Sequence, residues 1–460
     1  VKNAMDVKNA YDRVTAEQNA DRAGTLAAQG DRYGALNLLD EAIKLNPDKP
    51  DYYLQRARLK AGGNSDDQTG SLKDYDKYID ANKDKKTSEM AQVYAERARV
   101  RNDEDDSKGA LDDLNSAVRI KGEDAQLLAQ RAAVRQNAGD SAGAKGDLDR
   151  AVTAKPDDPN ILKQRAEFNR AQGKTQDALS DYDRAIQNTR GQDIESAHNI
   201  SRLTRGKAEV QAGQGDYKGA AATVESGAKA YEDRKLAPHG SNYGEQGDYL
   251  KAAVAASSDP REKDALQDRA IAAYGRAISQ GWNANLPDRA QLLTDKALAT
   301  QDPNQRGNLL GQAYRDADQA TKMPYLEPYK GLLERGRATY ASNYTNPSPS
   351  ASLYEQAITD FKAAITNTDN YGGSPEVARV REQANAHLSD ASYNRGGITG
   401  SRGDFERARN GYQAAISNNP NNPYYHDALA QAYDKLGERE AASAARVRAD
   451  QLRRQGRPPA

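Results

Sequence analysis

Residues 125–158 have the sequence AQLLAQRAAVRQNAGDSAGAKGDLDRAVTAKPDD, and this stretch decides the fold because its pattern recurs on both sides of it. Shifting the chain by 34 residues superimposes small and charged residues at fixed positions. The matching sets are Ala110, Ala144 and Ala178; Ala117, Ala151 and Ala185; and Arg97-Ala98, Arg131-Ala132 and Arg165-Ala166. A fixed period of this length predicts a repeat architecture in which each unit packs on its neighbours.

Within this unit, the residue pattern predicts two helices joined by a turn. The first helix ends at Gly139-Asp140. The second carries Ala144, Leu148 and Ala151 at spacings of four and three residues, which places them on one helix face. Pro156 ends the second helix, since proline lacks a backbone donor and disfavours a helical residue before it.

This pattern resembles the tetratricopeptide repeat, in which small residues occupy the helix crossing and large residues fill the gaps between helices. The resemblance implies an all-α fold, a right-handed superhelical solenoid of about eleven helix-turn-helix repeats, with the first helices lining a concave groove. The expected units lie near 16–49, 50–86, 91–124, 125–158, 159–192, 197–234, 243–284, 286–325, 326–371, 374–422 and 423–456. Residues 1–15 are expected to form an N-terminal capping helix, and residues 457–460 a frayed tail.

The composition excludes several kinds of protein. The net charge of -1 provides no strong field for steering nucleic acid or an anionic membrane. No run of 18 apolar residues is present, so no transmembrane segment is expected. With no Cys, the chain has no disulfide, thiolate metal site or Cys nucleophile. The start at Val1 suggests a processed N-terminus, and the abundant Tyr, Asn and Gly favour an extracellular or periplasmic location over a cytoplasmic one.

A charged pair recurs with the repeats. An Arg precedes the small residue of the first helix, and an Asp precedes the large residue of the second. The pairs are Arg56 with Asp74, Arg97 with Asp113, Arg131 with Asp147, Arg165 with Asp181, and Arg335 with Asp360. We expect structural ion pairs between the two helices of each unit; the alternative is a row of Arg side chains offered to an acidic ligand. Arg205 and Arg395 lack the matching Asp and are the first places to look for other contacts.

No catalytic or cofactor-binding constellation accompanies the repeats. Gly173-Lys174-Thr175 resembles the end of a phosphate-binding loop, but the Gly required five residues earlier is Phe168. The acidic run at 103–106 lacks the Gly and Glu of a calcium loop. The four His residues are scattered without metal-ligand spacing. We therefore expect a non-enzyme without cofactor or metal.

The expected function is a scaffold that binds a protein or peptide in a concave helical groove. Candidate groove residues in the middle units are Gln92, Arg99, Gln126, Gln136, Lys163 and Arg170. The alternative is a self-assembling extracellular fibre or surface subunit in which copies of the chain stack head to tail. Asn343 begins an Asn-Tyr-Thr tripeptide in the loop 342–352 and is a candidate glycosylation site if the protein is exported.

Overall fold

The computed structural model describes residues 2–323 and 325–456, and every regular element in this part of the chain is a helix. The chain divides into an N-terminal unit that ends at Gly191 and a C-terminal unit that begins at Gln192. The N-terminal unit contains α1 (Lys2–Ala28), α2 (Arg32–Leu45), α3 (Pro50–Lys60), α4 (Ser65–Asn82), α5 (Ser88–Asp103), α6 (Ser107–Lys121), α7 (Ala125–Asn137), α8 (Ser141–Ala154), α9 (Pro159–Ala171) and α10 (Thr175–Asn188).

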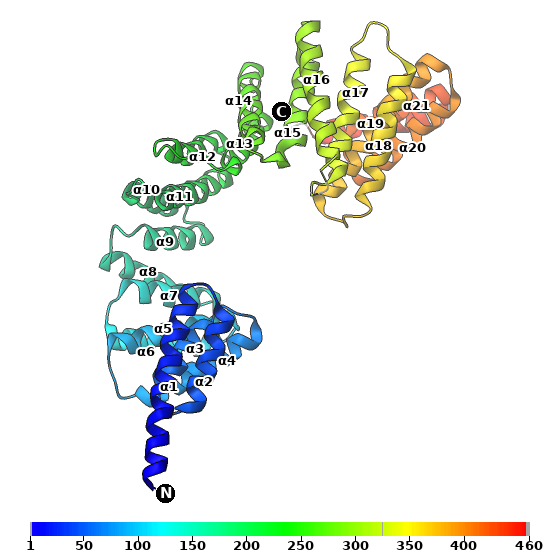
Figure 1. Cartoon of the computed structure of the whole chain (residues 1–460). Helices are drawn as coiled ribbons and strands as arrows, with labels where there is room; N and C mark the ends of the chain where they lie inside the picture. Colours follow the sequence, from blue (N-terminus) through cyan, green and yellow to red (C-terminus); the bar gives the residue numbers. More distant parts are fainter. Residues whose placement is uncertain (1, 324, 457–460) are drawn as a thin grey trace. The chain divides into compact units, whose positions relative to one another are not determined.

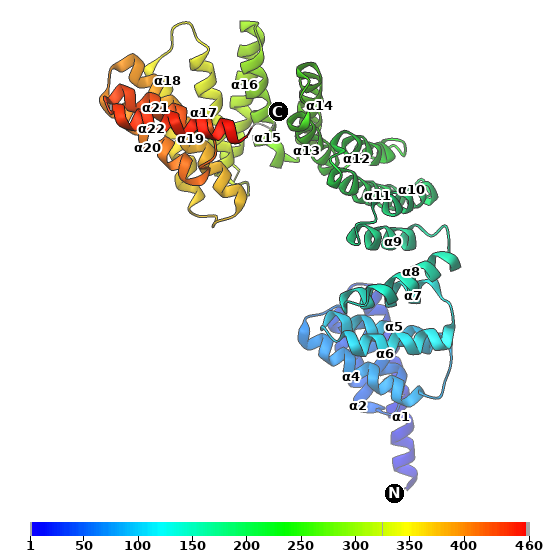
Figure 2. The same ribbon diagram turned by 180° about the vertical axis from the view of Figure 1, so that it is seen from behind.

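The C-terminal unit continues with longer helices. They are α11 (Ile194–Gly213), α12 (Tyr217–Glu232), α13 (Gly240–Ala256), α14 (Pro260–Ser279), the short 3-10 helix η1 (Asn283–Asn285), α15 (Leu286–Ala299), α16 (Pro303–Thr321), α17 (Pro328–Tyr344), α18 (Ala351–Thr368), α19 (Pro375–Thr399), α20 (Arg402–Asn418), α21 (Pro423–Leu436) and α22 (Arg439–Gln455). In both views α17 to α22 lie side by side (Figure 1, Figure 2).

Each odd-numbered helix packs against the even-numbered helix that follows it, from α1 with α2 to α21 with α22. We call the two members of such a hairpin its first and second helix. Within each unit, a second helix also packs against the first helix of the next hairpin, as α6 does against α7 and α18 against α19. The all-α repeat fold expected from the period is confirmed.

A short sequence signal forms the turn inside many hairpins. Gly139 adopts a left-handed conformation with φ of 82°, which carries no steric penalty for glycine. Asp140 then caps the second helix, because its carboxylate accepts a hydrogen bond from the backbone N–H of Gly143 at 2.8 Å. Equivalent caps join Asp31 to Gly34 and Asp216 to Gly219. The turn and the helix start are therefore encoded locally.

The seam between helices is narrow and filled by small side chains. The two sets of alanines that define the period, at 110, 144 and 178 and at 117, 151 and 185, are all 0% exposed. Leu114, Leu148 and Tyr182 fill the larger gaps and are also buried. Close helix approach requires such small residues at the crossing, because the interior is packed without room for extra volume.

The N-terminal helix differs from its predicted layout. The sequence pattern predicts a capping helix at 1–15 followed by a first unit at 16–49. In the structure α1 continues without a break through this boundary. Ala16, Ala20 and Ala23 pack in the core with Leu39, whereas Tyr11 is 71% exposed. Helix propensity continues across residue 15, and only the second half of α1 has a partner to bury it. The predicted tail at 457–460 lies outside the described residues. No described helix has the length and apolarity needed to cross a bilayer.

Candidate functional site

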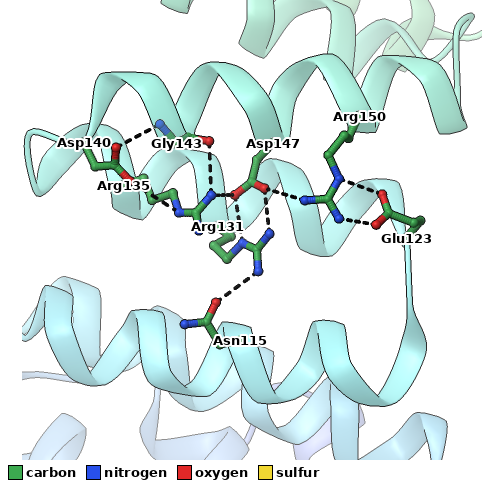
Figure 3. Close-up of polar contacts among 8 residues, drawn as sticks. All are labelled: Asn115, Glu123, Arg131, Arg135, Asp140, Gly143, Asp147 and Arg150. Carbon is green, nitrogen blue, oxygen red and sulfur yellow. Dashed lines mark hydrogen bonds and ion pairs between the residues drawn. The ribbon is translucent and has the colours of Figure 1, made fainter.

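The side chain of Arg131 joins three helices (Figure 3). Its Nε and Nη2 donate to the two carboxylate oxygens of Asp147 at 2.8 and 2.7 Å, which links α7 to α8. Its Nη1 donates to Oδ1 of Asn115 on α6 at 3.0 Å. One guanidinium therefore fastens its own hairpin and also the second helix of the preceding hairpin. We call this arrangement an arginine clamp.

Two further arginines complete the surroundings of Asp147 (Figure 3). Arg135, one helical turn after Arg131, donates to Asp147 at 2.8 Å and to the backbone oxygen of Gly143 at 3.2 Å. Arg150 lies 3.5 Å from Asp147 and also pairs with Glu123. The Asp147 side chain is only 1% exposed, so these charged hydrogen bonds compensate the loss of hydration of its carboxylate.

The clamp repeats at all five positions where the sequence predicts a pair. In each case Nε and Nη2 of the Arg donate to the Asp on the second helix of the same hairpin, at 2.5 to 3.0 Å. The Nη1 atom donates to an acceptor on the preceding second helix. These acceptors are Asp40 for Arg56, Asp76 for Arg97, Asn115 for Arg131, Asp149 for Arg165, and Asp318 for Arg335.

The second acceptor also has a sequence signal, which the pattern of Arg–Asp pairs within single hairpins does not reveal. Five second helices carry an Asp, a core residue, and then Asp or Asn, as in Asp147-Leu148-Asp149. The first Asp binds the Arg of its own hairpin, and on α4, α6, α8 and α16 the residue two positions later binds the Arg of the next one. The same signal reveals an unpredicted pair, since Asp316 precedes Ala317-Asp318 and binds Arg289 of α15 at 2.7 Å through two hydrogen bonds.

The two arginines without a matching Asp contact other carboxylates. Arg205 on α11 pairs with Glu245 on α13 at 2.8 Å. Arg395 on α19 donates to Asp404 in the first turn of α20 at 2.6 Å and lies 3.3 Å from Glu355 on α18. Arg395 thus fastens the same three kinds of helix as the regular clamps, through carboxylates at different sequence positions.

Pairing stabilises the charged form of two clamp arginines. The hydrogen bonds that Arg56 donates to Asp74 raise the pKa of Arg56 above its ordinary value, and those that Arg165 donates to Asp181 raise the pKa of Arg165. Asp74, Asp113, Asp147 and Asp181 are all buried. The guanidiniums bind the protein's own carboxylates, so the clamps fix the spacing of successive hairpins and do not offer a row of free cations to an acidic ligand.

The predicted groove residues lie on the first helices α5, α7 and α9. Gln92, Arg99, Gln126, Gln136 and Arg170 are exposed, and Lys163 is half-buried. Gln92 donates to Glu96 at 2.9 Å, Gln126 donates to Asp158 at 3.4 Å, and Lys163 pairs with Glu167.

A small cavity opens beside Arg99, between α5 and α7. Its volume is about 150 Å³, and it is lined by Ala95, Ala98, Arg99, Asn102, Leu114, Gln130, Ala133 and Val134. The buried residues Ala98, Leu114 and Val134 are apolar, while Arg99 and Gln130 are exposed and polar. This arrangement can receive an apolar side chain and offer hydrogen bonds to the backbone that carries it.

The repeat type follows from the 34-residue period, the paired helices with their Gly-Asp turns, and the alanine seam. In these features the repeats resemble the tetratricopeptide repeat. No protein-family model and no curated protein matches the sequence.

Several solved structures are similar to this chain. A tetratricopeptide repeat protein from Parabacteroides merdae is 15% identical, with a TM-score of 0.41, and the match covers 65% of this chain and 98% of that one. YrrB, described as a TPR protein with an unusual peptide-binding site, is 19% identical with a TM-score of 0.31, and the match covers 42% and 93%. PilF of Pseudomonas aeruginosa is 15% identical with a TM-score of 0.36, and the match covers 48% and 94%. These matches concern the fold alone.

The candidate glycosylation site is buried by the loop between α17 and α18. Asn343 is 0% exposed, near the end of α17. Its Nδ2 donates to the backbone oxygen of Ser350 at 2.7 Å, and its Oδ1 accepts from the backbone N–H of Ser350 at 2.8 Å. The amide nitrogen that would carry a glycan is therefore inaccessible in the folded chain. The tripeptide serves here to close the loop before α18.

The described hairpins do not bring metal ligands together. Across residues 2–323 and 325–456, no group of three or more His, Asp or Glu side chains is placed to hold a metal ion. His426 is buried, and its Nε2 lies 2.9 Å from the backbone oxygen of Pro420, where it ties α21 to the preceding turn.

Proposed function

We propose that this chain is a non-catalytic scaffold that binds a peptide or protein segment along the first helices of its N-terminal unit. The observation that carries the proposal is the cavity between α5 and α7. Buried apolar side chains at its base and polar side chains at its rim match the needs of an extended or helical peptide with one apolar anchor.

The arginine clamps support this function mechanically. Arg97 and Arg131 fasten the two hairpins that form the cavity, each with hydrogen bonds to two other helices. A site whose walls are held by buried charged hydrogen bonds loses little conformational entropy when a ligand binds, and this favours affinity. The polar rim and the balanced net charge favour a protein ligand over nucleic acid, which would require clustered Lys and Arg.

A substitution at the rim tests the site. Ala133 is exposed at the cavity, and Ala133→Trp would fill the space that the ligand needs. Ala142→Trp on α8 is the matched control, because Ala142 is equally an exposed alanine of the same hairpin and does not line the cavity. The full-length variants, immobilised and exposed to extract from the native source, are compared with wild type by quantitative mass spectrometry.

We expect wild type and Ala142→Trp to retain the same partner, and Ala133→Trp to retain about tenfold less of it, a change of about 1.4 kcal/mol. Equal retention by all three proteins would remove the cavity as the binding site.

A second candidate function is self-association of copies of the chain. It is favoured by the N-terminal part of α1, where Val7, Tyr11 and Val14 are exposed by 70%, 71% and 55%. Their spacing of four and three residues places them on one face of the helix, which suits packing against a second copy. Electron microscopy at high protein concentration tests it: we expect assemblies that disappear in a Val7→Ser, Tyr11→Ser double variant, and isolated wild-type particles would rule it out.

A further inference from the structure

The carboxylate of Asp390, in the middle of α19, is held by tyrosines from the next two helices. Its Oδ1 accepts hydrogen bonds from the hydroxyl of Tyr412 on α20 at 2.6 Å and from that of Tyr424 on α21 at 2.8 Å. The side chain of Asp390 is 15% exposed. Two phenolic donors thus fix the orientation of a largely buried carboxylate.

This carboxylate has no full positive charge beside it. Among the described residues its sole ion-pair contact is with His387, one turn earlier on α19, where Nδ1 lies 3.7 Å from Oδ2. The carboxylates of the arginine clamps differ, because each of them receives at least two hydrogen bonds from a guanidinium. Asp390 therefore accepts its hydrogen bonds from two tyrosine hydroxyls and pairs with no Arg or Lys among the described residues.

Two more tyrosines lie on α17, next to the turn of α19 that follows Asp390. Tyr340 and Tyr344 on α17 stack with ring centroids 5.6 Å apart and planes inclined by 14°. The Tyr340 hydroxyl accepts a hydrogen bond from Asn394, one turn beyond Asp390, at 3.0 Å. Tyr344 and Tyr424 are 57% and 52% exposed, so their rings reach solvent.

The tyrosines keep their protons in this setting. Burial, followed by the charge of Asp390, raises the pKa of both Tyr340 and Tyr424 above the ordinary tyrosine value. Their rings remain neutral and electron-rich on their faces, and their hydroxyls remain donors.

We propose that Asp390, together with Tyr344 and Tyr424, forms a binding site for a cationic side chain, a lysine or arginine of a partner protein. A cation gains from the faces of exposed aromatic rings and from an uncompensated carboxylate at the same time. An anionic group would be repelled by Asp390, and an apolar group would leave its charge without a partner. The site lies on α17, α19 and α21 and shares no residue with the cavity at α5 and α7.

The chain offers a matched pair for comparison. In the hairpin of α13 and α14, the Tyr274 hydroxyl donates to Asp248 at 2.8 Å, as Tyr412 does to Asp390. Tyr274 is 0% exposed, so this second pair lacks a solvent-facing ring. Substitution of Asp248 thus reports the loss of a tyrosine-bound carboxylate without loss of the proposed site.

The test uses two small probes with the full-length protein. N-acetyl-arginine amide carries the cation, and N-acetyl-citrulline amide has nearly the same shape without the charge. Saturation-transfer NMR measures contact between each probe and the protein. The variants are Asp390→Asn, Tyr344→Leu, Tyr344→Phe and the control Asp248→Asn. Tyr344 is exposed, so its variants are expected to fold as wild type does.

We expect transfer to the arginine probe to fall about fivefold in Asp390→Asn and about threefold in Tyr344→Leu. It should stay at the wild-type level in Tyr344→Phe, which keeps the ring, and in Asp248→Asn. Equal transfer to both probes, no transfer to the arginine probe, or wild-type transfer in both Asp390→Asn and Tyr344→Leu would overturn the proposal. Ala133→Trp should leave transfer to the arginine probe unchanged, because Ala133 lies at the cavity between α5 and α7 and not at Asp390. The test therefore separates a failure of this proposal from a failure of the peptide site proposed above.

Discussion

The two units build the same hairpin with different residues at the helix crossing. In the N-terminal unit the clamp Arg is followed by alanine, as in Arg56-Ala57 and Arg131-Ala132. In the C-terminal unit it is followed by glycine in Arg335-Gly336 and Arg395-Gly396. A Cβ at Gly336 would lie 2.7 Å from the ring of Phe361, which is shorter than any van der Waals contact. At this crossing the ring of Phe361 occupies the space that a methyl group at position 336 would need.

The units also differ in how they compensate buried carboxylates. From α3 to α10, each buried second-helix Asp is bound by the Arg of its own hairpin. The C-terminal unit adds tyrosine donors to the exposed Asp248 and the half-buried Asp390, and an ion cluster between α17 and α15. There Arg337 donates to the buried Glu334 at 2.7 Å and to Asp295 at 2.6 Å. The repeat is strictly periodic where the same Arg–Asp pair recurs. It is less regular where the helices are longer and the carboxylates bind other residues.

The largest expected effect comes from removing a regular clamp. Arg131→Ala leaves the buried carboxylate of Asp147 with only Arg135 and Arg150, and we expect the free energy of unfolding to fall by about 3 kcal/mol. Arg395→Ala should cost about half as much, because the Arg395 side chain is 27% exposed and Arg407 stays 3.3 Å from Asp404.

Urea unfolding of the full chain, followed by circular dichroism, measures both variants. Arg119→Ala is the control: Arg119 is exposed and bonds only within its own helix, so its loss should change stability by less than about 0.5 kcal/mol. An equal loss for Arg131→Ala and Arg395→Ala would show that the two kinds of clamp are energetically alike.

The helix crossings provide the next test. Gly247→Ala in α13 would press a methyl group into the ring of Tyr274, so we expect a loss of about 2 kcal/mol. Gly146→Ala in α8 meets no atom within 4 Å and should instead stabilise the protein by about 0.5 to 1 kcal/mol through helix propensity. Thermal melts in parallel measure both; a neutral Gly247→Ala would mean that α13 and α14 can separate without cost.

The smallest expected effect on stability at neutral pH comes from the buried tyrosines. This effect becomes larger at alkaline pH. Burial raises the pKa of Tyr243 and of Tyr329 to about 12, and that of Tyr412 further. An unfolded tyrosine loses its proton near pH 10, so the folded state binds protons more tightly and its stability falls as the pH rises above about 10.

Most of the strongly shifted tyrosines belong to the C-terminal unit, which also contains the single tryptophan, Trp282. We therefore expect the fluorescence of Trp282 to change at a lower pH than the circular dichroism of the whole chain during an alkaline titration. Coincident curves would indicate that both units lose stability together.

The sequence by itself determined the repeat length, the helix pairs and the five Arg–Asp pairs. Three of the pairs recur every 34 residues with Arg and Asp 16 positions apart, and all five lie within one hairpin, so the repeat register and helix geometry suffice to place them. Gly139-Asp140 shows the same locality, because a left-handed glycine and a capping Asp specify a turn without help from elsewhere.

Only the tertiary structure decided the contacts that depend on unequal spacing. The pairing of Arg289 with Asp316, the burial of Asn343 and the contact of Tyr424 with Asp390 each involve loops or helices whose lengths depart from the period. The continuity of α1 across residue 15 is a further example. A helix ends where its backbone hydrogen bonds end, which need not be the boundary between two repeats. Side-chain reach across neighbouring hairpins depends on how closely the helices pack, and packing is a property of the folded stack.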